Sequence, residues 1–216
     1  MNNVYFITGF PGFLATRLLK ELTLQYPKAR YRLLVLGSEW KAASAVIKDI
    51  CPSECDIELI QGDITKADLG IDRIKASLLQ QEVSHAFHLA ALYDLTASRG
   101  ACEVLNVQGT KNVTDWLKAC PLLMRYSYFS TAYVSGKRQG VIKEEELIQP
   151  NEFRNHYEET KFLAEKIVHE ARSHIPVTIF RPGIVTGDSE SGETQKFDGP
   201  YYLLTFLKKL RYFPVL

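Results

Sequence analysis

A tyrosine and a lysine stand four residues apart, at Tyr157 and Lys161, in a stretch that is predicted to be helical over residues 155–173. Residues with this spacing lie on one face of a helix, about 5 to 6 Å apart at Cβ. A lysine cation lowers the pKa of a neighbouring tyrosine, so the spacing predicts a phenol suited to proton transfer. The alternative is a tyrosine and a lysine that only share the helix surface.

Hydroxyl groups come shortly before this pair. Residues 126–130 predict a strand, and Thr131 follows it directly. The hydroxyl of Thr131 would then emerge at the carboxyl end of the strand, where it could hydrogen-bond a carbonyl oxygen that Tyr157 protonates. Thr131, Tyr157 and Lys161 therefore predict chemistry at a carbonyl group.

An alternating series of strands and helices is predicted to position these groups. Six short apolar, β-branched or aromatic runs are separated by helical segments, which predicts a doubly wound α/β fold with a parallel sheet covered on both faces. The predicted strands are residues 4–8, 31–36, 57–61, 86–90, 126–130 and 177–180.

The predicted helices carry recognisable patterns. Leu14, Leu18 and Leu22 recur every four residues after the first strand, which predicts one buried helix face. Residues 98–119 predict a long helix that contains Asn106. In the helix over residues 155–173 the apolar positions are Phe162, Ile167 and Val168, and the polar ones are Glu158, Glu159, Glu165 and Lys166.

A glycine-containing turn joins the first strand to the first helix. Gly9 permits a tight turn, Gly12 lets the backbone approach a pyrophosphate, and Ala15 is small enough for the helix to pack on the strand. The turn predicts phosphate binding at the start of a helix, and an ordinary strand–helix turn is the alternative.

Two further strand ends fit a dinucleotide. Asp63 follows the third strand, where it could accept a hydrogen bond from an adenine amino group or could cap the following turn. His88, Leu89, Ala90 and Ala91 end the fourth strand, and their small residues would let a dinucleotide lie against the backbone. His88 itself is interpreted as a packed strand residue rather than a catalytic base.

The end of the second strand does not decide between the two nicotinamide dinucleotides. A carboxylate at this place grips the ribose of NAD, and a cation accepts the 2′-phosphate of NADP. Glu39 favours the first and Lys41 the second.

Composition limits the classes of partner. The chain has 216 residues, 46% of them hydrophobic, with 26 Lys and Arg against 25 Asp and Glu, a net charge of +1. This balance predicts a small-molecule partner and no nucleic acid. The sequence contains no apolar run of about 18 residues, the length that would predict a membrane span. We therefore expect a cytoplasmic protein. The acidic run after Lys143 predicts a solvated face, with binding of a cationic partner as the alternative.

The four cysteines predict reduced thiols and no metal site. Cys51 and Cys55 are the one close pair, and no second Cys/His pair follows to complete a tetrahedral set.

Taken in order, these motifs resemble the short-chain dehydrogenase/reductase superfamily in its extended form, from Val4 to about Tyr202. The resemblance implies a Rossmann-like fold in which Thr131, Tyr157 and Lys161 are catalytic and Asn106 supports a water relay to Lys161. The residues that it implies at the cofactor are Thr8, Gly9, Phe10, Pro11, Gly12, Phe13, Leu14, Asp63, Ile64, Leu89, Ala90, Ala91, Tyr157, Lys161, Pro182, Gly183 and Ile184.

Within that superfamily the chain is most similar to the thioester reductase and fatty acyl-CoA reductase branch. The similarity rests on Phe13 and Leu14, on Leu92 to Leu95, on Thr131 in place of serine, and on the segment from Gly187 to Thr194. It implies hydride transfer from NADPH, or from NADH, to a thioester carbonyl, which leaves an aldehyde. Gly37 stands where this branch often has the arginine that binds the NADP phosphate.

Two other functions stay open. A nucleotide-sugar epimerase or dehydratase, or a hydroxysteroid-type dehydrogenase, would use the same three residues, and a non-catalytic NAD(P)-binding sensor would keep only the fold. The substrate is expected to be an acyl-CoA or a carrier-bound thioester, and a homodimer is an open expectation.

The predicted domains are an NAD(P)-binding Rossmann domain over residues 1–197 and the start of a substrate-binding region over 198–216. The resemblance implies that the C-terminal substrate lobe is largely missing. A chain of this length is therefore expected to bind NAD(P) and to reduce substrates poorly.

Overall fold

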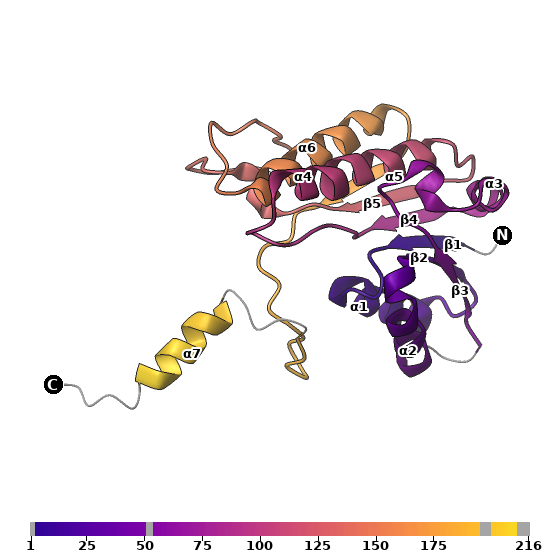
Figure 1. The fold of residues 1–216 in the computed structure, drawn as a ribbon, viewed down its shortest axis with the longest axis horizontal. Coiled ribbons are helices and arrows are strands. Elements are labelled where there is room, and N and C mark those ends of the chain that lie inside the picture. The colour runs from indigo at the N-terminus through magenta and orange to yellow at the C-terminus, as the bar shows by residue number, and fades with distance from the viewer. Residues whose placement is uncertain (1–2, 51–53, 195–199, 211–216) are drawn as a thin grey trace. The chain divides into compact units, whose positions relative to one another are not determined.

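The computed structural model describes residues 3–50, 54–194 and 200–210 (Figure 1). It divides into two compact units, Met1–Arg181 and Pro182–Leu216, and each is described by itself. The predicted domain boundary at residue 197 stays a prediction.

A parallel sheet forms the centre of the first unit. Its order is β3-β2-β1-β4-β5-β6, so the strand order reverses between β1 and β4, where doubly wound sheets bind ligands. The strands are β1 (Val4–Thr8), β2 (Arg30–Val35), β3 (Asp56–Gln61), β4 (His85–His88), β5 (Arg125–Phe129) and β6 (Val177–Phe180). Each of the six predicted strands is found, with its ends within two residues of the predicted ones.

Helices cover both faces of this sheet (Figure 1). One face packs on α1 (Phe13–Gln25) and α2 (Trp40–Ile50). The other packs on α3 (Arg73–Glu82), α5 (Gly109–Lys118) and α6 (His156–Glu170). Successive residues of a strand point to opposite faces, so Tyr5 and Ile7 of β1 enter the first core while Val4 and Phe6 enter the second. The predicted Rossmann-like α/β class is confirmed.

The buried stripe of α1 differs from the predicted one. Ala15, Leu19 and Leu22 are buried, Leu18 is half-buried, and Leu14 is 37% exposed. A constant four-residue spacing drifts around a helix of 3.6 residues per turn, so the sheet-facing stripe follows a spacing of four and then three. The leucine pattern identified the helix and placed its face about one residue off.

The predicted helix over residues 98–119 contains a widened segment. Ser98 caps α4 (Arg99–Cys102), and the chain continues through the π-helix η3 (Glu103–Gln108) into α5. Such π segments often occur at functional sites, and this one contains Asn106.

The helix α6 begins after Asn155, whose side chain accepts a hydrogen bond from the backbone of Glu158 at 2.9 Å. Two of its polar positions, Glu158 and Glu165, are buried. Both carboxylates have hydrogen-bond donors, Arg154 N for Glu158 and Ser130 with Arg181 for Glu165. The polar pattern of this helix therefore does not coincide with its solvent face.

Short 3₁₀ segments connect the larger elements. They are η1 (Gly37–Glu39), η2 (Ala67–Gly70), η4 (Ala132–Ser135) and η5 (Ala171–Ser173). In the second unit, α7 (Pro200–Leu210) exposes the large apolar side chains of Tyr202, Leu203, Leu204, Phe206 and Leu207.

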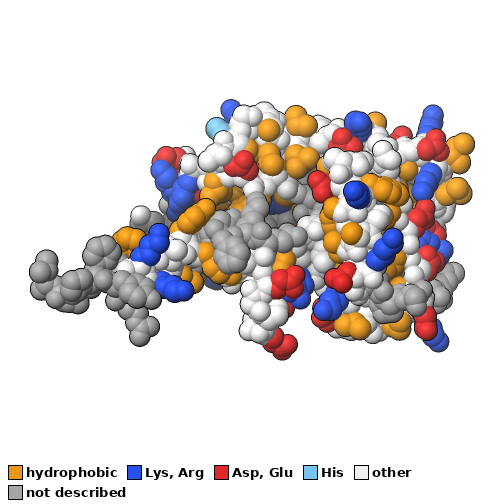
Figure 2. All heavy atoms as spheres, turned by 60° about the horizontal axis from the view of Figure 1, so that its bottom comes forward, with side chains coloured by type: hydrophobic (Ala, Val, Ile, Leu, Met, Phe, Trp, Pro, Cys, Tyr) orange, Lys and Arg blue, Asp and Glu red, His pale blue; other side chains and the backbone are white. Residues whose placement is uncertain are grey.

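Positive and negative side chains are interspersed over the visible face of the molecule in Figure 2. None of the helices within the described ranges combines the length and apolar character needed to cross a bilayer.

Candidate functional site

The carboxyl end of β5 brings two predicted catalytic side chains together. Thr131 caps η4 just after the strand, and Tyr157 lies in the first turn of α6. The hydroxyl of Thr131 acts on the phenol of Tyr157 and lowers its pKa, and the two residues are only 4% and 7% exposed. A hydroxyl and a phenol thus share one partly enclosed place at the edge of the sheet.

The protonation of Tyr157 differs from the prediction. Burial raises its pKa to about 12, and the hydrogen bond from Thr131 offsets only part of that effect. The expected lowering by Lys161 is wrong for this structure, in which the nearby groups that act on Tyr157 include Tyr93 and Tyr133. At neutral pH the phenol therefore keeps its proton and can act as an acid.

The ring of Tyr157 is held by a second tyrosine. Tyr93, in the loop after β4, meets it edge to face with ring centroids 5.2 Å apart. This geometry is favourable for two aromatic rings. The segment that contains Tyr93 entered the sequence analysis only for its similarity to the reductase branch. The contact between Tyr93 and Tyr157 was not predicted.

Lys161 reaches the same strand from the next turn of α6. Its Nζ donates to Tyr128 Oη at 2.9 Å and to the carbonyl of Phe129 at 2.8 Å, and it lies 4.5 Å from the centre of the Tyr128 ring. Burial lowers the pKa of Lys161 to about 7, against the opposing effect of Glu165. The lysine is thus anchored to β5 close to Thr131.

The side chain of Asn106 is buried and hydrogen-bonded inside the protein. Its Oδ1 accepts from the backbone of Leu92 at 2.8 Å, and its Nδ2 donates to Thr160 Oγ1 at 3.1 Å. These bonds tie the loop after β4 to α6. The predicted water relay from Asn106 to Lys161 stays a prediction.

The turn at Gly9 is tight, as the sequence predicted, and Gly9 lies close to the backbone after β4. Gly9 has a φ of +85°, and a Cβ on it would lie 2.6 Å from the backbone nitrogen of Ala90. Gly12 donates to the carbonyl of Gly9 at 2.8 Å, and α1 begins at the next residue. The turn therefore presents the first amide groups of α1 beside the end of β4, which suits a pyrophosphate.

The other predicted cofactor residues of the first unit lie around this turn. Thr8 is buried at the end of β1, the Phe10 side chain is in the core, and Leu89, Ala90 and Ala91 are half-buried. The backbone carbonyl of Pro11 accepts a hydrogen bond from Thr16 Oγ1. The guanidinium carbon of Arg17 lies over the Phe13 ring, 5.5 Å from the ring centre.

Asp63 and Ile64 are held in place by local bonds. Asp63 accepts from the backbone and hydroxyl of Thr65, and Asn112 of α5 donates to the carbonyl of Ile64 at 2.8 Å. Gly109 packs closely here, since a Cβ on it would lie 2.7 Å from the end of the Ile64 side chain. Asp63 thus acts in the turn, and its contact with adenine stays a prediction, as does the role of Pro182, Gly183 and Ile184 in the second unit.

A family model described as male sterility protein, of an NAD-binding type, matches residues 7–216. The chain belongs to this family. The predicted resemblance to the reductase branch is thereby confirmed, and NAD(P) is the cofactor class of the male sterility family.

The chain is similar to a fatty acyl-CoA reductase and to the R domain of a biosynthetic pathway. A fatty acyl-CoA reductase of Drosophila melanogaster is 26% identical, covering 91% of this chain and 45% of the relative. The terminal R domain of the myxalamid pathway superposes with a TM-score of 0.82 at 28% identity, covering 94% of this chain and 54% of that one. The chain thus spans about half the length of these relatives.

A third similarity concerns the fold alone. The UDP-glucuronic acid 4-epimerase of Bacillus cereus superposes with a TM-score of 0.66 at 24% identity, covering 85% of this chain and 57% of that one.

The sequence pattern did not predict one buried polar cluster beside Thr131. Glu165 is 1% exposed, and its carboxylate accepts from Ser130 Oγ at 2.5 Å and from Arg181 Nη2 at 2.6 Å. It lies one helical turn after Lys161, as Lys161 lies one turn after Tyr157, and this repeat was the available signal. The pair joins α6 to the ends of β5 and β6, directly beside Thr131.

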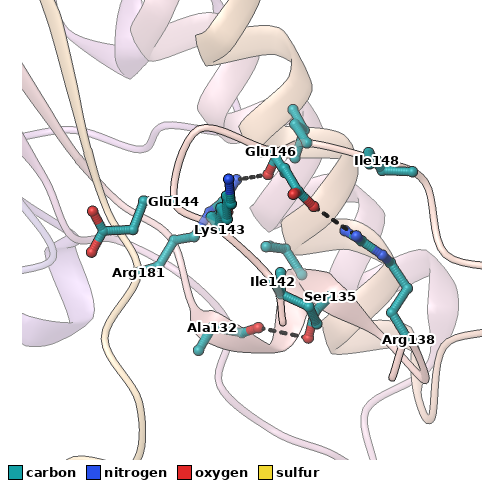
Figure 3. Close-up of a pocket in the computed structure, with 11 residues that line it drawn as sticks. Ala132, Ser135, Arg138, Ile142, Lys143, Glu144, Glu146, Ile148 and Arg181 are labelled. Atoms are coloured by element: carbon teal, nitrogen blue, oxygen red, sulfur yellow. Dashed lines mark hydrogen bonds and ion pairs between the residues drawn. The ribbon is translucent and has the colours of Figure 1, made fainter. Parts of the chain in front are cut away.

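A pocket of about 300 Å³ opens beside η4 (Figure 3). Ala132 and Val134 of η4 line this pocket, and so do Arg181 and Glu146. Arg181 Nη2 donates to the backbone carbonyl of Glu146 at 2.7 Å. Glu146 also pairs with Arg138 at 2.7 Å, so the end of the acidic run is partly engaged rather than solvated. Arg181 therefore connects Glu146, at the pocket, to the buried carboxylate of Glu165.

The cysteines that the structure describes are free thiols, and Cys102 and Cys120 are buried. Cys51 lies outside the described residues. Within the described ranges no three His, Cys, Asp or Glu side chains form a group able to hold a metal ion.

Proposed function

We propose that this chain carries the nucleotide-binding and proton-transfer parts of an NAD(P)H-dependent reductase that converts an acyl thioester to an aldehyde. The observation that carries this proposal is the placement of the Thr131 hydroxyl beside a buried Tyr157 phenol that keeps its proton at neutral pH. Membership of the male sterility family and the reductase names of its relatives support it.

In the proposed reaction, Thr131 and Tyr157 hydrogen-bond the carbonyl oxygen of the thioester. When bound, NAD(P)H supplies a hydride to the carbonyl carbon. Negative charge then develops on the oxygen that the two hydroxyls hold, and it forms the aldehyde carbonyl again as the carbon–sulfur bond breaks. The departing sulfur takes one proton, which Tyr157 supplies, so a thiol and an aldehyde are released. One such hydrogen-bond donor typically contributes about 10²- to 10³-fold in rate.

Lys161 and Asn106 have supporting roles in this proposal. The amine of Lys161, anchored to β5, would bind the ribose next to the nicotinamide and return a proton toward Tyr157. Asn106 would hold the water that supplies Lys161, from its position in the π segment.

The cofactor would lie along the edge formed by the ends of β1, β4 and β3. The turn from Gly9 to Gly12 would bind the pyrophosphate, and Asp63 with Ile64 would lie beside adenine. NADPH is the proposed cofactor, with NADH as the alternative that Glu39 favours.

The proposed substrates are an acyl-CoA or a carrier-bound acyl thioester. The Drosophila relative is named for the first, and a solved archaeal relative is a thiolation-reductase di-domain of a non-ribosomal peptide synthetase. We also propose that the chain binds a partner carrier protein and forms a homodimer.

The experiment is a panel in which oxidation of NADH and NADPH is followed with acyl-CoA, ketone and sugar-nucleotide substrates. We expect aldehyde formation from acyl-CoA, at a low rate, and about 10²-fold less in Thr131→Val. Thr131→Ser keeps the hydroxyl and should retain the rate, and Thr114→Val is the control for loss of a buried hydroxyl.

Two results would contradict the proposal. Conversion of a sugar nucleotide without thioester reduction would favour the epimerase. Cofactor binding with no turnover of any substrate, by this chain and by a longer protein that contains it, would favour the sensor.

A further inference from the structure

A line of buried polar groups crosses the sheet beneath the proposed site. Thr8 is the register partner of His88 across β1 and β4, and His88 is the register partner of Tyr128 across β4 and β5. Each of these side chains is at most 1% exposed, as is Thr110 in the first turn of α5. Polar groups this deeply buried need partners, and these four have one another.

Polar contacts join them into one series. Lys161 Nζ donates to Tyr128 Oη at 2.9 Å, and the hydroxyl of Thr110 acts on the Tyr128 phenol, where it offsets part of the effect of burial on the pKa of Tyr128. Thr110 Oγ1 lies 3.1 Å from His88 Nε2, and His88 Nδ1 lies 2.7 Å from Thr8 Oγ1. Thr8 also accepts from the backbone of Ala90 at 3.3 Å.

The series has one consistent direction. A lysine ammonium only donates, so Tyr128 accepts from it and passes its own proton to Thr110. Thr110 then donates to Nε2 of His88, which leaves the single ring proton on Nδ1, facing Thr8. Burial lowers the pKa of His88 to about 3, so the ring is neutral at pH 7 and carries one N–H, as this direction requires.

We propose that Tyr128, Thr110, His88 and Thr8 are positioning residues, which form a directional hydrogen-bond chain that holds the Lys161 amine and connects it to the glycine turn. The far end of the chain lies at Thr8 and Ala90, on both sides of Gly9. The chain thus links the lysine to the segments that the cofactor is proposed to touch. A contribution of this chain to catalysis rests on the proposed function. Its effect on the position and pKa of Lys161 does not depend on that function.

The charged and titratable groups around Lys161 come from three elements. They are Tyr157 and Glu165 on α6, Tyr128 on β5 and His88 on β4. An acceptor for the amine stabilises its charged form, so loss of the Tyr128 hydroxyl should lower the pKa of Lys161.

The same strand and helix provide matched controls. Tyr126 lies on β5 two residues before Tyr128, is equally buried, and bonds Thr114 of α5 at 3.3 Å. Tyr126→Phe and Thr114→Val therefore remove the same groups, from the same core, without touching the chain. Each substitution should lower the melting temperature about as much as its counterpart.

The test is a titration of Lys161 by NMR in the 216-residue protein with ¹³C-labelled lysine, with the signal assigned from Lys161→Arg. In Tyr128→Phe we expect the titration midpoint to fall by about one pH unit, the loss of a hydrogen bond to a charged group. Thr110→Val should lower it in the same direction, although Thr110 does not bond Lys161. Tyr126→Phe and Thr114→Val should leave it at the parent value.

Two further measurements complete the test. Nitrogen NMR of His88 should find its proton on Nδ1, and the affinity for NADPH at pH 7 should fall about tenfold in Tyr128→Phe but not in Tyr126→Phe. A midpoint that moves equally in Tyr128→Phe and Tyr126→Phe, or a proton on Nε2, would overturn the chain. If the midpoints shift as expected but Lys161→Ala binds NADPH normally, the chain stands and the proposed role of Lys161 fails.

Discussion

The two ends of the sheet bury different kinds of side chain. Around β1 to β3, the core against α1 and α2 is mainly apolar, the buried polar side chains are few, namely Thr8, Thr23 and Arg32, and the features at the edge are a glycine turn and backbone amides. Around β4 to β6, buried polar side chains meet between the strands and the helices; these are His88, Asn106, Thr110, Thr114, Ser127, Ser130, Thr131, Glu158, Thr160, Lys161 and Glu165.

This difference corresponds to two tasks. Backbone groups can bind a pyrophosphate whatever side chains surround them, provided that no Cβ blocks the approach. Proton transfer instead needs specific groups held in place by specific partners. We therefore expect the first end to be sensitive to added atoms and the second to lost hydrogen-bond partners.

The largest effect is expected for the buried ion pair. Glu165→Ala leaves Arg181 without its carboxylate partner and should lower the free energy of unfolding by about 3 to 5 kcal/mol. Lys111→Ala removes an exposed pair with Asp115 and should cost at most about 0.5 kcal/mol. Urea unfolding measures both, and similar losses would contradict the distinction.

The pH dependence of stability follows from Lys161. Its pKa is lowered to about 7 by burial, so between pH 10.5 and 7 the unfolded chain holds a proton that the folded chain lacks. The stability that this group contributes is fully present above pH 10.5. It is lost progressively as the pH falls from 10.5 to about 7, by about 1.4 kcal/mol per pH unit. Relative to Lys161→Met, the parent should lose stability over this range and stay level below pH 6. A difference that is constant from pH 6 to 10 would contradict the lowered pKa.

The glycine turn should respond to one added side chain. A Cβ at Gly12 would lie 2.7 Å from the carbonyl of Gly9, so Gly12→Val should weaken NADPH binding by at least about tenfold. Gly100→Ala is the control, since its Cβ would meet no atom within 4 Å. Calorimetry on folded protein decides, and unchanged affinity in Gly12→Val would remove the turn from the cofactor site.

The smallest effect is expected in a comparison of two aspartates, Asp63 in the turn after β3 and Asp72 at the N-terminus of α3. Asp63→Ala and Asp72→Ala each remove an acceptor for backbone amides and should each cost about 1 kcal/mol of stability. Asp63→Ala alone should also weaken NADPH binding, by a few-fold, if Asp63 contacts adenine. Equal affinities in the two variants would limit Asp63 to its turn.

The sequence was sufficient for the elements and for the order of the motifs. Strand propensity and alternation located β1 to β6, and the pairing of Thr131 with Tyr157 followed from their places after β5 and on α6. These features depend on local residue patterns, which a single sequence displays.

The failures lie where tertiary contacts decide. Glu165 has a polar side chain, and only the approach of Arg181 and Ser130 makes its burial favourable. The pKa of Tyr157 rises because the site is buried, which the spacing to Lys161 does not indicate. The π segment around Asn106 has no marker in its residue pattern.

The central claim is that Tyr157 donates the proton while the other end of the sheet binds the cofactor. Its most direct test is NADPH-dependent aldehyde formation from acyl-CoA by Tyr157→Phe, with Tyr126→Phe as the control and NADPH affinity measured in both. We predict a loss of about 10²-fold or more in Tyr157→Phe with unchanged affinity, and parent-like rates in Tyr126→Phe. A Tyr157→Phe protein that forms aldehyde at the parent rate would contradict the account.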